Sequence, residues 1–124
     1  MGKKIIEIRW FEQPEPHNYP AAGSYLSLIF EPTTAKAHVV KLRKAEVTEF
    51  KAKDIFRASG LSLLGVSNSH VLRDQKKLKA NEKISPLLLV RDPVFGRVIV
   101  ADGYHRLCAI YSFFEDAVVR CKIV

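Results

Sequence analysis

The sequence predicts an α/β (α+β) fold, in which helices pack on a mixed β-sheet. The clearest pattern lies in the last third, where two apolar segments, residues 86–91 and 97–101, flank a turn that contains Pro93 and Gly96. Such a turn between two apolar strands is typical of a buried hairpin. Segments with helical spacing of apolar residues stand before and after the hairpin, so helices are expected to cover the sheet.

The first third predicts one strand and two helices. Apolar residues alternate with their neighbours in a first strand, as expected when one face is buried: Ile6, Ile8 and Trp10. A proline-rich loop, residues 12–20, leads to a helix over residues 21–30, which ends before Pro32. Its expected buried face consists of Tyr25, Leu28 and Ile29. A second helix follows from the spacing of Ala35, Val39 and Leu42.

The middle of the chain predicts short elements. Residues 47–51 form either a strand or the continuation of the second helix. Residues 54–58 predict one or two helical turns, which Gly60 ends. A surface helix then ends near Asn81 and presents one buried stripe, which consists of Val71, Gln75 and Leu78. Its cap is expected to be Ser67 or Ser69.

Two further elements close the fold. A helix over residues 104–114 is apolar on most sides beyond Arg106, so the sheet and another layer should cover it, with only its first turn open. Residues 118–123 supply the closing strand.

Length and composition predict one domain over residues 1–124, with residues 1–46 as an N-terminal strand and helical extension. The chain has 124 residues, 48% of them hydrophobic, and no apolar run that approaches the length of a membrane span. No signal peptide is apparent at the N-terminus. Cys108 and Cys121 have neither a disulfide-framework spacing nor a metal-ligand spacing, so a reducing cytoplasm is expected, with both thiols in the core.

The net charge of +7 is concentrated in residues 33–83, which contain twelve basic and five acidic side chains. Such an excess attracts nucleic acid or a small polyanionic ligand, although it is also typical of a solvated helix face. Lys76, Lys77 and Lys79 lie near acidic residues and without interleaved aromatics. This composition favours capture of a nucleotide over binding of nucleic acid.

A strand that turns at a glycine into a helix is the most informative motif. It runs from the apolar strand through Asp102 and Gly103 into Tyr104, His105 and Arg106. The first amides of a helix lack intrahelical partners and lie at the positive end of its dipole, so they can hold an anion. Phosphate is the natural candidate, with His105 and Arg106 in the first turn.

This Asp-Gly-x-His-Arg turn, after a Pro-Leu-Leu-Leu-Val-Arg strand and a hairpin, resembles the ParB/sulfiredoxin superfamily. The resemblance covers residues 47–124 and is closest to the branch of free-serine kinases and small bacterial proteins. Tyr104 stands where sulfiredoxin places its reactive cysteine, so sulfinic-acid repair is not expected. Chromosome-partitioning ParB proteins carry an Arg-Arg pair in this turn, so a partition protein is not expected either.

The resemblance implies a nucleotide- or phosphate-binding protein, and in that branch a small-molecule phosphotransferase or nucleoside triphosphatase. The implied phosphate contacts are Gly103, Tyr104, His105 and Arg106. A second wall of the site is implied just before a helix, at Asn68, Ser69 and His70. Asp102 and His105 would be catalytic, and Mg²⁺ would arrive with the nucleotide.

Structural alternatives stand beside these roles. Gly103 is also what a sharp turn needs, and Asp102 is also a plausible helix cap. His105 could be a neutral ring bonded to a backbone carbonyl, and Tyr104 could close over the hairpin. Arg106 needs a partner from another element, or a ligand. A capping box at the start of its helix would explain Asn68, Ser69 and His70 equally well.

Two function classes therefore remain. One is an enzyme, which would need a second carboxylate; the candidates are Glu46, Glu49, Asp54 and Asp74. The other is a non-catalytic binding or interaction module, associated with nucleic acid through residues 33–83. In either class the protein could assemble as a homodimer. The remaining histidines, such as His17 and His38, show no ligand spacing for a metal site.

Overall fold

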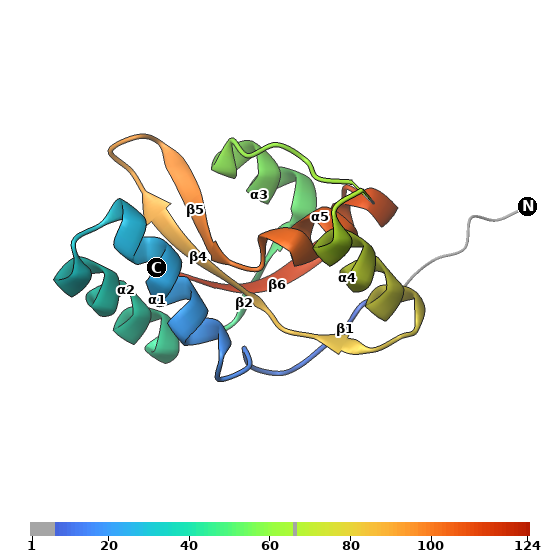
Figure 1. Cartoon of the computed structure of the whole chain (residues 1–124), viewed down its shortest axis with the longest axis horizontal. Helices are drawn as coiled ribbons and strands as arrows, with labels where there is room; N and C mark the ends of the chain where they lie inside the picture. The colour runs from blue at the N-terminus through green and yellow to red at the C-terminus, as the bar shows by residue number, and fades with distance from the viewer. Residues whose placement is uncertain (1–6, 66) are drawn as a thin grey trace, which may run out of the picture.

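A four-stranded mixed sheet forms the middle layer of the computed structural model, which describes residues 7–65 and 67–124 (Figure 1). Its strands are ordered β2-β6-β4-β5 and span Thr48–Lys51 (β2), Leu87–Asp92 (β4), Arg97–Asp102 (β5) and Val118–Ile123 (β6). β4 runs parallel to β6, whereas β4–β5 and β2–β6 are antiparallel. The predicted hairpin, closing strand and mixed sheet are confirmed, and residues 48–51 are a strand rather than the continuation of a helix.

Both faces of the sheet are covered at β4, which explains why residues 87–90 of this strand are all apolar and buried. Leu87 and Leu89 point to one face and Leu88 and Val90 to the other, because successive side chains of a strand alternate. Each face carries its own hydrophobic cluster. The domain is therefore of the α+β class with helices on both sides of one sheet.

Helices α1 (Asn18–Ile29) and α2 (Pro32–Lys44) cover one face of the sheet (Figure 1). The other face carries α3 (Ala52–Ser59), α4 (Ser69–Lys79) and α5 (Tyr104–Phe113). The helical segments expected from the sequence are thus present, and the predicted burial of α5 beyond Arg106 is confirmed from Leu107 to Ile110. The prediction that only its first turn is open is wrong, because that turn is half-buried and the exposed end is the last turn, with Ser112 and Phe114. Gly60 ends α3 in the left-handed conformation, with φ of 66°.

The expected orientation of α1 is wrong. The helix begins at Asn18, three residues before the predicted start, and Asn18 Oδ1 accepts a hydrogen bond from the Glu15 amide at 2.8 Å. Ala22 and Leu26 face the core, whereas Leu28 is 85% exposed. Tyr25 and Ile29 are exposed as well. Packing of α1 on α2 and β5 turns the face that carries Tyr19, Ala22 and Leu26 inward, and the predicted face remains outside.

The N-terminal strand lies outside the main sheet. β1 (Arg9–Trp10) pairs in parallel with β3 (Lys83–Ile84), a short strand that the sequence did not predict. Ile6, which was expected in the first strand, lies outside the described residues.

The buried stripe of α4 is confirmed, because Val71, Gln75 and Leu78 are all buried. Its predicted cap is wrong. Asn68, and neither neighbouring serine, caps the helix: its Oδ1 accepts hydrogen bonds from the amides of His70 at 3.0 Å and Val71 at 3.2 Å.

Both cysteines are buried free thiols, as expected for small core residues. Burial raises the pKa of the Cys121 thiol to about 12 and also raises the pKa of Cys108. Within residues 7–65 and 67–124, no helix has the length and apolarity that crossing a membrane requires.

Candidate functional site

Gly103 makes the turn from β5 into α5. It is the N-cap residue of α5 and has φ of 105°, a conformation that side chains with a Cβ rarely adopt. A Cβ built on it would lie 2.7 Å from Leu87 Cγ and 2.9 Å from Arg106 Nη2. The steric reason for a glycine here is therefore present, and it leaves the start of α5 without a capping side chain.

Asp102 does not cap α5. Its Oδ2 accepts a hydrogen bond from Arg106 Nη2 at 3.0 Å, and both side chains are only 17% exposed. The alternative that Asp102 caps the helix is thus wrong, because Arg106, one helical turn away, holds the carboxylate. Within the part of the chain that the structure describes, no side chain accepts a hydrogen bond from the first amides of α5.

Arg106 ties the turn to the segment before β4. Its Nε donates to the Ser85 carbonyl at 3.1 Å, and Nη2 lies 3.5 Å from the Pro86 carbonyl. The Ser85 hydroxyl in turn donates to Glu15 Oε1 at 2.6 Å. These contacts supply the partner from another element that the sequence required. Nη1 has no hydrogen-bond partner among residues 7–65 and 67–124.

The start of α4 lies beside the start of α5. The rings of His70 and His105 are 4.8 Å apart between centroids, with an angle of 34° between their planes. His70 was thus expected near this turn and is brought to it, 35 positions away in the sequence. Asn68 uses its side chain as the α4 cap, and Ser69 is an exposed first residue of that helix.

His105 is held toward its neutral form. Burial lowers its pKa below the ordinary value of 6.5, and the nearby His70 and Arg73 lower it further, whereas the Asp74 carboxylate raises it. No hydrogen bond from its ring to a backbone carbonyl is present among the described residues. The alternative of a His105 ring bonded to a carbonyl is therefore wrong. A neutral ring in contact with solvent keeps a nitrogen that can accept a proton.

Tyr104 packs against the core cluster that contains Leu87 and Val100 of the hairpin, and it also contacts the loop after α3. Its hydroxyl donates to the Ser62 carbonyl, and its ring lies 5.9 Å from the His105 ring. Burial raises the pKa of the Tyr104 hydroxyl. The Tyr104 hydroxyl is therefore occupied, and the phosphate contact predicted for this residue would require its backbone amide.

The four candidate carboxylates do not converge. Asp74 is 4% exposed and acts electrostatically on His105. Glu49 faces Arg120 across β2 and β6, and Asp54 lies in the first turn of α3. Glu46 is exposed beyond the end of α2. Only Asp74 is placed to influence the α5 turn.

Sequence reasoning missed Lys122, which is only 2% exposed. Its Nζ donates to the Tyr19 hydroxyl at 3.0 Å and to the Arg43 carbonyl at 3.1 Å. The alternation of the closing strand, with Val119 and Cys121 on the other face, was the available signal. Since α1 and α2 cover this face, the lysine belongs to the core and not to the α5 turn.

The basic excess of residues 33–83 is divided between two sides of the molecule. Part of it lies on α2 and part on α4, and these helices flank opposite faces of the sheet (Figure 1). Association with nucleic acid through residues 33–83 stays a prediction.

Comparison with protein-family models, with curated proteins and with solved structures found no match. Membership of the ParB/sulfiredoxin superfamily therefore stays a prediction. Across the described residues, no group of three or more His, Cys, Asp or Glu side chains is placed to hold a metal ion.

Proposed function

We propose that this protein binds the phosphate groups of a nucleotide, or of another phosphorylated small molecule, at the start of α5. The observation that carries the proposal is the uncapped helix start after Gly103, flanked by the paired rings of His105 and His70. Free amides and the helix dipole supply a site for negative charge, and imidazoles beside it donate hydrogen bonds when protonated.

The surrounding charges support an anionic ligand. Arg73 and Arg106 both act on His105, and Arg106 has Nη1 free of partners in the described chain. Asp102 is already held by Arg106, so it serves the site by positioning that guanidinium rather than by repelling phosphate. A nucleotide would bring Mg²⁺ as its own counter-ion, since the described residues form no separate cluster for it.

Phosphoryl transfer is the enzymatic form of this proposal. It relies on positioning and on stabilisation of charge more than on covalent chemistry. His105 is the residue at the turn whose lowered pKa leaves it ready to accept a proton from a hydroxyl group. Thermal-shift measurements with adenine, cytosine and guanine nucleotides, with and without Mg²⁺, test the binding step. No stabilisation by any of them would contradict a nucleotide ligand.

Binding should strengthen as the pH falls, because an anion favours the charged form of His105. Sulfate is a suitable probe, since it stays fully ionised between pH 8 and pH 5.5. We expect calorimetric titration to show about tenfold tighter binding at the lower pH. The rise should be much smaller in His105→Gln and unchanged in the control His17→Gln, which removes an exposed histidine at the start of α1.

The ligand-free protein should show the opposite trend. The pKa of His105 is below its unfolded value, so the unfolded chain takes up a proton first as the pH falls below 6.5. The contribution of His105 to stability is therefore present above pH 6.5 and is lost below it.

An equal rise of sulfate affinity in His105→Gln and in the unchanged protein would contradict the role of His105 in binding the anion.

A further inference from the structure

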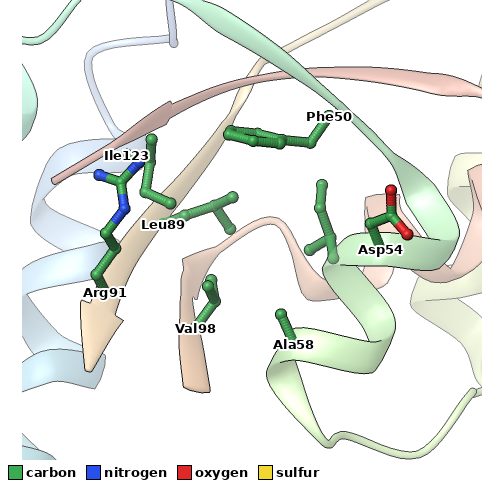
Figure 2. Close-up of a pocket in the computed structure, with 8 residues that line it drawn as sticks. Phe50, Asp54, Ala58, Leu89, Arg91, Val98 and Ile123 are labelled. Carbon is green, nitrogen blue, oxygen red and sulfur yellow. The ribbon is translucent and has the colours of Figure 1, made fainter. Parts of the chain in front are cut away.

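A separate pocket of about 220 Å³ opens between α3 and the sheet (Figure 2). Leu89, Val98 and Ile123 line it from β4, β5 and β6, while Ile55 and Ala58 line it from α3. The ring of Phe50 on β2 lies over it and remains 39% exposed. None of the residues of the α5 turn lines this pocket, so it is distinct from the proposed phosphate site.

Two opposite charges lie at opposite sides of this apolar space. Figure 2 shows the Arg91 guanidinium beside Ile123 at one side and the Asp54 carboxylate at the other. Neither side chain has an ion-pair partner among residues 7–65 and 67–124. The other arginine of the same hairpin, Arg97, is by contrast paired with Asp92 at 3.0 Å.

We propose that this pocket binds a small organic carboxylate, with its apolar body between Phe50 and Leu89 and its carboxylate on Arg91. The volume lies below the range of about 300–1,000 Å³ that is usual for drug-sized ligands, so the ligand has one ring or a short branched chain. A guanidinium binds a carboxylate through charge-assisted hydrogen bonds. Asp54 fixes the orientation, because it repels the anionic end of the ligand.

The guanidinium of Arg91, which is unpaired within the described chain, favours an acid over a fully apolar molecule of the same size, because only the acid gains a charge-assisted contact. A phosphorylated sugar has no apolar body to place on Leu89, which is 1% exposed. An aromatic or branched aliphatic acid satisfies both the apolar lining and the charge.

The test uses 3-phenylpropionate and its uncharged amide, 3-phenylpropionamide, with the full chain followed by two-dimensional NMR. We expect the acid to bind with a dissociation constant of about 1 mM, the range for a ligand of this size. The amide should bind about tenfold more weakly. The largest shifts should map to residues of β4 and α3 that line the pocket.

Three variants make the test specific. Arg91→Gln should weaken the acid about tenfold and leave the amide unchanged, so that the two ligands bind alike. Arg97→Gln is the matched control and should retain the preference for the acid. Ala58→Leu should fill the pocket and weaken both ligands. The proposal is overturned by equal binding of acid and amide to the unchanged protein, by an Arg91→Gln variant that keeps the preference, or by shifts that map to the α5 turn instead.

Discussion

Gly103→Ala is expected to destabilise the protein by about 3 kcal/mol, which combines left-handed backbone strain with overpacking. The new methyl group would lie 2.7 Å from Leu87 Cγ and 2.9 Å from Arg106 Nη2. Leu87 is fully buried, so it has no open space into which to retreat. The melting temperature should fall by about 10 °C for a chain of this size.

Gly96→Ala is the matched control, because it separates the two contributions. Gly96 also has a positive φ, 62°, but an added Cβ would meet nothing within 4 Å. The Gly96→Ala variant should therefore lose about 1 kcal/mol of stability, from backbone strain alone. Equal losses in the two variants, measured by chemical denaturation, would show that the contacts around Gly103 do not constrain the turn.

Arg106→Ala is expected to lose about 2–4 kcal/mol of stability in the absence of any ligand. The change removes the ion pair with Asp102 and leaves the Ser85 carbonyl without the guanidinium. Because both charged side chains are only 17% exposed, solvent compensates little for the loss. Arg106→Lys should rescue part of the stability, since it keeps the charge but not the planar fork of donors.

Arg97→Ala is the control for this variant. Arg97 makes a hydrogen-bonded pair with Asp92 at the same distance of 3.0 Å, but its side chain is 46% exposed. Such a pair contributes up to about 1 kcal/mol, so the melting temperature should change little. If Arg106→Ala melted like Arg97→Ala and instead lost sulfate binding, Arg106 would act as a phosphate contact and not as a structural tie.

The elements with strong periodicity could be predicted from the sequence. The hairpin of β4 and β5, the buried stripe of α4 and the burial of α5 follow from local patterns of apolar residues. The orientation of α1 could not, because packing against α2 and β5 buries the face with Tyr19, Ala22 and Leu26. The positions of the neighbouring elements decide which face of a helix is covered, and a local pattern does not contain them.

The candidate site was predictable only in part. The strand-glycine-helix turn and the need for Gly103 are local, and the structure shows both. The choice of Asp102 between capping α5 and pairing with Arg106 depends on where the Ser85 carbonyl places the guanidinium. The contact between His70 and His105 joins two helix starts, and no spacing within either helix determines it.

The most direct test of the proposed site is an amide NMR titration with sulfate at pH 6. The account predicts saturable shifts that are largest at the amides of Tyr104, His105 and Arg106, and these shifts should weaken in His105→Gln. Shifts confined to the basic last turn of α4, at Lys76, Lys77 and Lys79, would contradict it. That result would show that sulfate binds to surface charge and leaves the start of α5 empty.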